Sequence, residues 1–321
     1  MTMQPWLSVL IPIYNGEAYL SYALDSIIAQ GDDNIECIVV DGESTDTTWS
    51  ILNTYQDRLP IKLLTRERKT NWVIKTNYAL SFAKGNYICF LHHDDLWLKG
   101  RLRIMKQLTE RFPEVVLLLH PSNFLDNKGN NLGLWSCPLP VFPEIIKPNL
   151  MLERLLVQNF ISILGPIFKR EVALKVRGLD ESLWYTADWD FWLKIATCGD
   201  TLYYPKPLSG FRIHPSSQTI IRSSHLQDLR GQLESVAKKY FALWEAPEHL
   251  KQRACKIADF SIEVNVALAS TVHGQKTNLV ALLISFVLLG PSGWYRYLRD
   301  SRIWERVSAR LKARLTTHLE R

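Results

Sequence analysis

The segment that ends in two histidines and two aspartates has the residue types of a cation site. Asp94 and Asp95 directly follow an apolar run, Tyr87–Leu91, and the pair His92 and His93. Adjacent carboxylates at the end of a strand are ligands for Mg²⁺ or Mn²⁺, and an imidazole nitrogen from either histidine would favour Mn²⁺. The alternative is a pair of surface acids, which the apolar run immediately before them disfavours.

A second pair of acids, Asp188 and Asp190, opens a segment with helical periodicity over residues 188–197. A carboxylate placed in a binding site can act as a general base toward a hydroxyl group. Asp188 is our first candidate for that role and Asp190 the second. The competing interpretation is that both are helix-start acids stabilised by the macrodipole.

Two further sites have residue types suited to ligand binding. Arg212 and His214 are two residues apart, so on a strand they share one face and can both point at an anion. His214 can equally be a loop histidine before Pro215. Asp41 follows a strand-like run, where it can accept hydrogen bonds from a base or a ribose, or simply stabilise the turn that Asp-Gly favours.

The elements that must position these groups alternate between strand and helix patterns over the first ~120 residues, which predicts an α/β fold with a mostly parallel central sheet. We expect strands at 7–13, 35–40, 61–64 and 87–91, and helices from 20, from 44 or 45, over 72–83 and over 101–111. Ligands bind beyond the carboxyl ends of such strands. Those ends carry Tyr14-Asn15, Asp41-Gly42 and His93-Asp94-Asp95, which predicts one shared site.

The later part of the chain has weaker patterns. Residues 121–150 are rich in Pro, Gly and Asn, and we expect a long irregular segment or lid there. We expect helix over 151–176 and 188–197, strand or loop over 201–215, and helices throughout from about residue 225. These patterns divide the chain into an α/β domain, 1–222, and a helical C-terminal region, 223–321.

Composition narrows the possible location and partners. The net charge is +6, of which residues 294–321 contribute +5 through eight Lys/Arg against three Asp/Glu. This basic tail lacks the signals of a nucleic-acid reader, so no nucleic-acid partner is expected. Five cysteines without a CxxC and an N-terminus without signal-peptide features favour the cytoplasm.

Two C-terminal segments suggest contact with a membrane. Leu279–Leu289 is strongly apolar but has only eleven residues, whereas a bilayer span needs about 20. Ile303, Val307, Leu311 and Leu315 then recur every four residues among arginines, as in a basic amphipathic helix. Such a helix either packs as a cap with a solvated face or lies on an anionic membrane surface, and we lean slightly to the second.

Taken together, the ordered motifs resemble those of the family 2 glycosyltransferases. The resemblance covers roughly residues 7–215 and rests on order and spacing: Pro12-Ile13-Tyr14-Asn15, VVDGESTD (39–46), AKGNYICFLHHDD (83–95), ADWDFWLKIA (187–196) and FRIHP (211–215). It implies the GT-A fold of nucleotide-diphospho-sugar transferases, with the C-terminal helices as an extension.

The resemblance assigns roles to the candidate residues. It implies that Asp41 contacts the base of a UDP- or GDP-linked sugar, with Pro12, Tyr14, Asn15, Asn77 and Asp94 near the nucleotide. It implies that Asp94, Asp95 and His214 hold Mg²⁺ or Mn²⁺, that Arg212 and His214 face the diphosphate, and that Trp189 and Asp190 lie near the acceptor. Asp188 would be the base of an inverting transfer to a saccharide or lipid-linked acceptor, in surface polysaccharide or glycolipid synthesis on the inner face of the cell membrane.

Two positions depart from the family pattern. His92 stands where the family commonly has the first Asp of Asp-x-Asp-Asp, and Ala187 stands where it has a Glu before the base. These departures keep a catalytically inactive nucleotide-sugar-binding module open as an alternative. A nucleotidyltransferase is the other alternative, but the segment PIYNGEAYL lacks the Gly-rich basic loop of that class.

Overall fold

The computed structural model describes residues 4–67, 70–140 and 144–318. Its N-terminal part alternates strands and helices where the hydrophobic periodicity predicts them. In chain order these are β1 (Leu7–Ile13), α1 (Leu20–Ile28), β2 (Ile35–Asp41), α2 (Thr48–Tyr55), β3 (Ile61–Thr65), α3 (Trp72–Phe82) and β4 (Tyr87–Phe90). All seven residues of β1 are buried, because both faces of this central strand are covered.

The middle of the chain adds short strands and helices to this frame. They are β5 (Leu96–Trp97), α4 (Arg101–Arg111), β6 (Leu117–Leu119), β7 (Ser122–Leu125), β8 (Asn131–Trp135), β9 (Glu144–Ile146), α5 (Pro148–Leu155), β10 (Ile167–Lys169), α6 (Arg170–Lys175), α7 (Ala187–Thr197), β11 (Thr201–Tyr203) and β12 (Ser209–Arg212).

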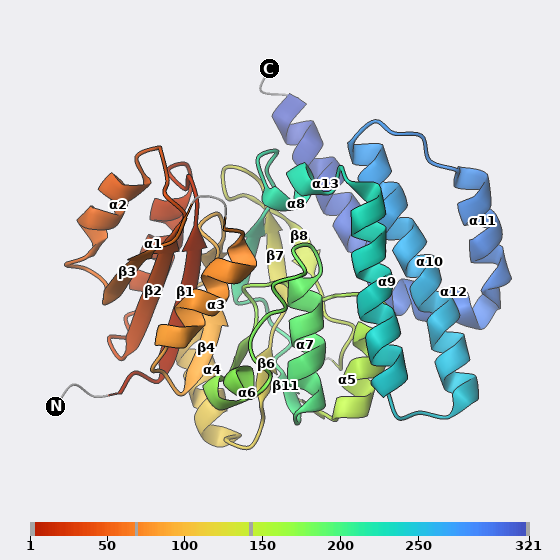
Figure 1. Cartoon of the computed structure of the whole chain (residues 1–321), viewed down its shortest axis with the longest axis horizontal. Helices are drawn as coiled ribbons and strands as arrows, with labels where there is room; N and C mark the ends of the chain where they lie inside the picture. The colour runs from red at the N-terminus through yellow and green to blue at the C-terminus, as the bar shows by residue number, and fades with distance from the viewer. Residues whose placement is uncertain (1–3, 68–69, 141–143, 319–321) are drawn as a thin grey trace.

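The strands form two sheets. The larger has eight strands in the order β3-β2-β1-β4-β10-β6-β11-β9, and the smaller has the order β5-β12-β7-β8. Strands β3, β2, β1 and β4 are parallel, whereas β10 runs antiparallel to both of its neighbours. The predicted α/β fold with a central, largely parallel sheet and flanking helices is therefore confirmed (Figure 1).

Two local predictions were wrong. Residues 121–150 are not one irregular segment, because β7 and β8 pair as an antiparallel hairpin in the smaller sheet and β9 joins the larger one. Part of that range, 141–143, lies outside the described residues. Residues 151–176 are not one helix either, since β10 inserts between α5 and α6 as a buried strand. A strand of three residues, Ile-Phe-Lys, is too short for periodicity to separate strand from helix.

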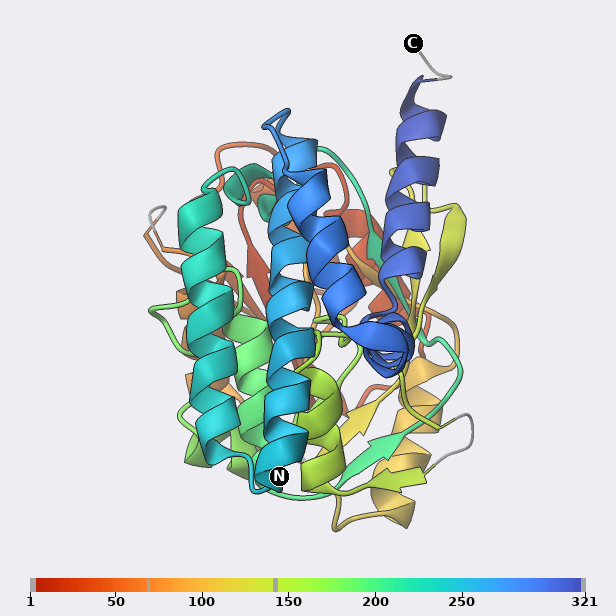
Figure 2. The same ribbon diagram turned by 90° about the vertical axis from the view of Figure 1, so that its right-hand side faces the viewer.

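The C-terminal region is helical, as predicted, with α8 (Gln218–Arg222), α9 (Leu226–Leu243), α10 (Glu248–Val272), α11 (Leu279–Leu288), α12 (Gly290–Ser301) and α13 (Ile303–His318). Helices α9 to α12 lie beside one another on one side of the sheets (Figure 2). Buried residues of α9 and α10 belong to the same hydrophobic cluster as the sheet. The boundary at residue 222 stays a prediction.

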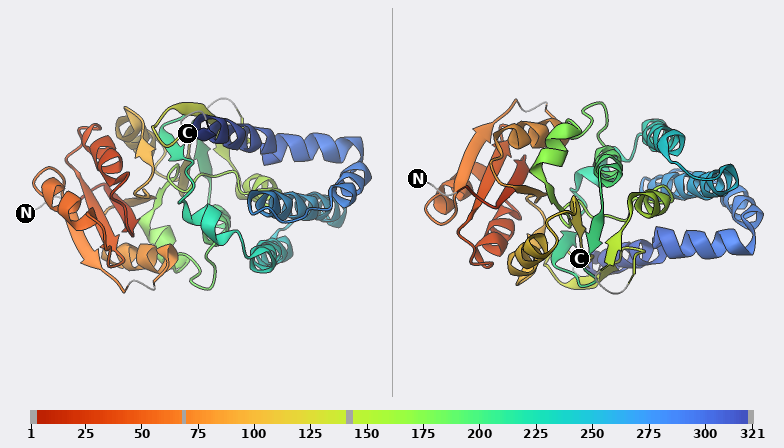
Figure 3. Two further views of the ribbon diagram at one scale, coloured as in Figure 1. Left: turned by 90° about the horizontal axis from the view of Figure 1, so that it is seen from above. Right: turned by 90° about the horizontal axis from the view of Figure 1, so that it is seen from below.

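Helix α13 leaves this group and runs back toward the sheets. It packs against β8, with Ala309 and Ala313 buried against Phe124 and Leu132 (Figure 3). Ion pairs of the fully buried Asp300 fix helix α12, which precedes α13. The Asp300 carboxylate pairs with Arg154 of α5 at 2.6 Å and with Arg299 of α12 itself. The last residues of the predicted basic tail, 319–321, lie outside the described residues.

Among the described residues, no single helix has the length and apolar composition needed to cross a bilayer. Helices α11 and α12 meet those criteria only as a pair, and they are bent by 111° where they join.

Candidate active site

A cavity of about 520 Å³ opens at the carboxyl ends of β1 and β4, where the polar clusters were predicted to meet. It is walled by the β1–α1 loop, the start of α3, the segment after β4, the start of α7, the segment after β12, and helices α9, α10 and α13. Of the predicted residues, the following line it: Pro12, Tyr14, Asn15, Asp94, Asp95, Asp188, Trp189 and His214. Two of the three clusters predicted to meet, Tyr14-Asn15 and His93-Asp94-Asp95, therefore share one cavity, whereas Asp41-Gly42 is not in its lining.

The segment after β4 gathers three groups that can bind a metal ion. One ligand atom from each of His92, Asp94 and Asp95 lies within 4.8 Å of the others. The Nε2 of His92 is buried and has no hydrogen-bond partner among the described residues. A buried nitrogen without a partner, beside two carboxylates, fits a divalent cation with mixed oxygen and nitrogen ligands.

Burial sets the protonation states of this cluster. It lowers the pKa of His92 to about 4, so the ring is neutral at pH 7 and can donate its lone pair to a metal. Burial alone would raise the pKa of Asp94, but His93, the hydrogen bond from His214 and His92 outweigh it and hold that pKa well below its usual range. Burial and the charge of Asp94 raise the pKa of Asp95 well above its usual value. A cation would relieve the repulsion between the two carboxylates.

Strand β12 positions this cluster. The backbone N–H of Arg212 donates to Asp95 at 2.9 Å, and His214 Nε2 lies 3.0 Å from a carboxylate oxygen of Asp94. The Arg212 guanidinium donates to the carbonyls of Asp94, Asp126 and Asn127. The arginine is 2% exposed and is absent from the cavity lining, so in this structure it orients the acids and does not face the cavity.

The start of α7 brings Asp188 to the cavity wall. Its carboxylate accepts hydrogen bonds from Asn159 Nδ2 at 2.9 Å and from the backbone N–H of Trp189 at 2.8 Å. Burial raises its pKa to about 6, although these two bonds oppose the shift. The indole N–H of Trp189 donates to the carbonyl of Leu155, so this ring is a fixed part of the wall. Asp188 is thus positioned in the cavity with a basicity suited to proton transfer near neutral pH.

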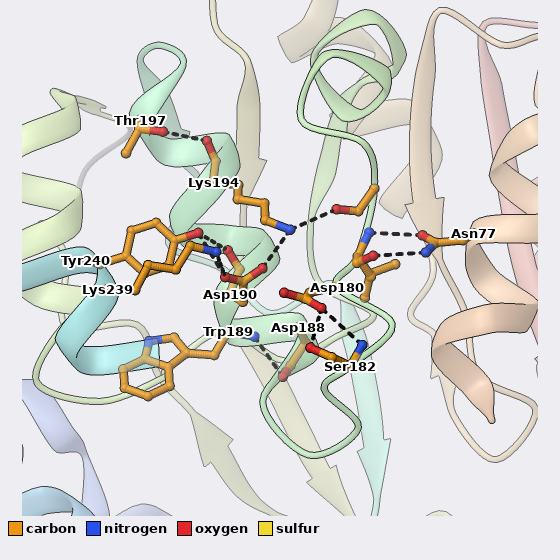
Figure 4. Close-up of polar contacts among 12 residues, drawn as sticks. Asn77, Asp180, Ser182, Asp188, Trp189, Asp190, Lys194, Thr197, Lys239 and Tyr240 are labelled. Atoms are coloured by element: carbon orange, nitrogen blue, oxygen red, sulfur yellow. Dashed lines mark hydrogen bonds and ion pairs between the residues drawn. The ribbon is translucent and has the colours of Figure 1, made fainter. Parts of the chain in front are cut away.

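Asp190 lies elsewhere, although it is only two residues away. It is 1% exposed and pairs with Lys194 and Lys239 at 2.7 Å each, while Tyr240 donates to it at 3.0 Å (Figure 4). These contacts join α7 to α9. Asp190 is not among the cavity-lining residues, and its predicted role near the acceptor has no support from its position.

Two residues predicted near the nucleotide are also outside the lining. Asp41 is fully buried and accepts hydrogen bonds from Ser44 and from Trp49 Nε1, so it anchors its own loop. Asn77 exchanges hydrogen bonds with the backbone of Leu179, which ties α3 to the segment before α7 (Figure 4). Base contact by Asp41 stays a prediction, and the fully buried carboxylate would have to become accessible for it.

His93, one of the two candidate nitrogen ligands, also lines the cavity, whereas several cavity residues were missed: Lys75, Trp72, Asn159, Arg306 and Arg310. Lys75 is buried on α3 and donates to the carbonyl of Ile13 at 2.6 Å, so it braces the end of β1. Asn159 holds Asp188 from 29 residues away, and nothing in the local sequence indicates this. The two arginines belong to the basic amphipathic helix, which was interpreted as a cap or a membrane-surface helix.

A family model matches the N-terminal half of the chain. The model of the glycosyl transferase family 2 matches residues 8–173, about half of the chain. The chain belongs to this family. An uncharacterized glycosyltransferase of Rickettsia typhi is 26% identical over 240 residues, which cover 74% of this chain and 73% of that one.

Solved structures agree on the fold. Residues 1–349 of S. aureus TarS in complex with UDP-GlcNAc match with a TM-score of 0.62 at 18% identity, covering 93% of this chain and 79% of that one. The mannosyltransferase PcManGT from Pyrobaculum calidifontis, in complex with GDP-Man and Mn²⁺, matches with a TM-score of 0.58 at 19% identity, covering 97% and 88%. A longer TarS chain is matched over 43% of its length. The protein is a glycosyltransferase with the GT-A fold.

Proposed function

We propose that this enzyme transfers a sugar from a UDP- or GDP-linked donor to an acceptor hydroxyl, with Mg²⁺ or Mn²⁺ and with inversion at the anomeric carbon. The observation that carries the proposal is the meeting of two separate groups in one cavity: the cluster His92, Asp94 and Asp95, and the carboxylate of Asp188. Each group supplies what the other lacks, a place for an anionic leaving group and a base for the attacking hydroxyl.

Asp188 is the proposed base. With a pKa of about 6 it is ionised at pH 7, yet it is more basic than an ordinary aspartate. Asn159 and the Trp189 N–H fix its orientation. It would take the proton of the acceptor hydroxyl as the oxygen attacks the face of the anomeric carbon opposite the nucleotide, which inverts the configuration in one step.

The metal would be held by His92, Asp94 and Asp95, with His214 beside Asp94. When bound, a divalent cation neutralises the charge that develops on the departing nucleoside diphosphate. The chain's own part is to hold these ligands in place: Arg212 fixes Asp95 through its backbone N–H, and Ser216 lies 2.9 Å from His214 Nδ1. Pro12, Tyr14 and Asn15 would shape the nucleotide pocket on the β1 side.

The donor class is supported by the structural neighbours, since TarS was solved with UDP-GlcNAc and PcManGT with GDP-Man. The acceptor would be a saccharide or a lipid-linked glycan, in the synthesis of surface polysaccharide or glycolipid. We place the enzyme in the cytoplasm, peripherally on the inner face of the membrane. Helix α11 supports this, because six of its apolar side chains are each more than half exposed: Leu279, Val280, Leu283, Ile284, Val287 and Leu288.

Calorimetric titration tests the donor site. UDP and GDP are each titrated into the full chain with and without Mn²⁺, and a cognate UDP- or GDP-sugar is then assayed for release of nucleotide. Tight, Mn²⁺-dependent binding of one nucleotide with turnover of its sugar is the expected result. Binding without turnover would support the inactive-module alternative, and binding of neither nucleotide by the folded protein would refute the proposed donor class.

A further inference from the structure

The C-terminal helix completes the wall of the cavity near Asp188. Arg306 and Arg310 are one helical turn apart on α13, and both line the cavity. The helix is fixed there by the burial of Ala309 and Ala313 and by Lys312, which donates to the carbonyl of Leu132 at 3.0 Å. These two arginines therefore belong to the cavity wall and do not face a membrane.

Neither arginine forms an ion pair with a carboxylate of the described residues. Within the described parts of the chain, no carboxylate lies within ion-pair distance of Arg306 or Arg310, and the buried Nη1 of Arg306 has no hydrogen-bond partner. Arg310 makes one long hydrogen bond, 3.4 Å, to the carbonyl of Arg306. The arginines just before them also have buried nitrogens without a hydrogen-bond partner, but they form ion pairs, Arg296 with Glu153 and Arg302 with Glu305.

Such an arrangement costs free energy unless a ligand compensates it. Burial lowers the pKa of Arg306 below its usual value and lowers that of Arg310 to about 10, to which Arg306 also contributes. Two desolvated cations that have no carboxylate in ion-pair contact are unfavourable in a folded protein. A bound dianion would supply both the missing charge and the missing hydrogen-bond acceptors.

Arg306 lies within electrostatic range of Asp188, the proposed base in the wall of the same cavity. The groups that influence Arg306 electrostatically are Tyr185, Tyr297 and Asp188. Those that most influence Asp94 are His93, His214 and His92. An anion bound by the arginines would therefore lie near Asp188, and nucleotide titration of arginine variants distinguishes it from the diphosphate expected at the metal cluster.

We propose that Arg306 and Arg310 bind a phosphate group carried by the acceptor, close to the hydroxyl that receives the sugar. The acceptor class is then a phosphorylated sugar or polyol, free or as a repeating unit of a polymer. The inference rests on the proposed function, because Asp188 as the base is what places the acceptor on this side. Planar guanidinium groups suit phosphate oxygens, and two of them match its double charge.

The test uses sn-glycerol 3-phosphate as the probe and glycerol as its uncharged counterpart. Each is titrated by calorimetry into the full chain, with and without Mn²⁺ and the nucleotide that binds. The variants are Arg306→Gln, Arg306→Lys and the double variant Arg306→Gln/Arg310→Gln. The matched control is Arg58→Gln, which removes the same charge from an exposed ion pair with Asp25.

We expect wild type to bind glycerol phosphate but not glycerol, with at least a tenfold loss in the double variant and a smaller loss in Arg306→Lys. Arg58→Gln should bind as wild type, and nucleotide affinity should stay within twofold in all variants. The variants should fold, because removing an unpaired buried charge relieves a cost. Their melting temperatures check this.

Three results would overturn the inference. They are a wild type that binds no glycerol phosphate, a double variant that binds it undiminished, and an equal loss of nucleotide and glycerol phosphate affinity, which would assign the arginines to the donor. Failure of the proposed function has a different readout, because wild type would then bind neither nucleotide. The titration without nucleotide still reports on the arginines in that case.

Discussion

The same substitution, aspartate to asparagine, can be made at Asp188 and at Asp190 of helix α7. The structure predicts that it has opposite effects on the stability of the fold at these two positions. Asp188→Asn removes a carboxylate whose charge is unfavourable in the fold, whereas Asp190→Asn removes one that is held by two lysines. Transfer activity should be lost in Asp188→Asn if that residue is the base. The stability comparison separates this chemical role from damage to the fold.

The effect at Asp188 follows from its pKa. The folded state raises it from 3.8 to about 6, so the native protein binds the proton more tightly than the unfolded chain. Stability from this group is therefore present at low pH and is lost as the pH rises through about 6, by up to about 3 kcal/mol at pH 7. Asparagine avoids that cost but disturbs the bond from Asn159, worth about 1 kcal/mol. The net expectation is a gain of about 2 kcal/mol.

The effect at Asp190 has the other sign. Its carboxylate is 1% exposed and is bonded by Lys194, Lys239 and Tyr240. Removing one partner of a buried ion pair costs about 3–5 kcal/mol. We expect about 3 kcal/mol, because the side chain of Lys239 is 44% exposed and can be rehydrated.

Thermal unfolding at several pH values measures both effects. The average entropy of unfolding per residue gives a shift of roughly 1.5 °C per kcal/mol for 321 residues. At pH 7 we expect Asp188→Asn to melt about 3 °C above wild type and Asp190→Asn about 4 °C below it. The gain in Asp188→Asn should shrink between pH 6 and pH 4, as the wild-type carboxyl becomes protonated.

One outcome would refute this reasoning. If Asp188→Asn melts below wild type at pH 7 by as much as Asp190→Asn, with no change toward pH 4, then Asp188 is a satisfied structural carboxylate. Its loss of activity would then say nothing about proton transfer. A stable Asp188→Asn that keeps full activity would remove it from the mechanism altogether.

Three further predictions concern the pH dependence, the metal and the membrane. Since Asp188 must be ionised to accept a proton and its pKa is about 6, kcat/KM should fall tenfold per pH unit below pH 6, which a pH–rate profile will show. Chelation with EDTA, or Asp95→Asn in the presence of Mn²⁺, should lower nucleotide affinity at least tenfold by calorimetry, and unchanged affinity would exclude this cluster as the metal site. The double variant Leu283→Asp/Val287→Asp should no longer float with anionic vesicles, whereas the control Leu174→Asp, on the exposed surface of α6, should float as wild type does. Equal flotation of wild type, the double variant and the control would exclude α11 as the contact.

The α/β frame and the place of the site could be predicted from the sequence because they depend on local periodicity. Strand β2 ends at Asp41 and β4 just before the histidines, so a parallel sheet must bring both ends to one edge. The sheet does so. The backbone N–H of Thr45 also donates to the Asn15 side chain, which joins the loop after β2 to the loop after β1. The positions of the elements therefore required no knowledge of distant contacts.

The direction in which each side chain points could not be predicted in the same way. Asp188 and Asp190 have the same type and the same helix, but only one reaches the cavity, because Lys239 from α9 holds the other. One local signal was available: Lys194 lies four residues after Asp190, the spacing of an ion pair on a helix. Arg212 is similar, since its partners are carbonyls of segments far away in the sequence.

The basic tail shows why composition alone gave an incomplete interpretation. A helix with arginines on one face and apolar residues on the other suits an anionic membrane, but it equally suits a cavity that binds an anion. Trp304, Leu311 and Leu315 of α13 are exposed, while Arg306 and Arg310 face inward. The same helix can thus belong to the active site and still present an apolar outer surface.

The family match and the cavity do not have the same extent. The match ends at residue 173, after the segments that carry Tyr14, His92, Asp94 and Asp95. Asp188, His214 and the arginines of α13 all follow that point, yet they line the same cavity. If the acceptor lies against these later elements, relatives can keep the donor half and change acceptor by altering the C-terminal helices alone. The low identity of this chain to its relatives is then compatible with a shared donor chemistry and a different acceptor. The most specific indication of that acceptor is the unpaired charge of Arg306 and Arg310.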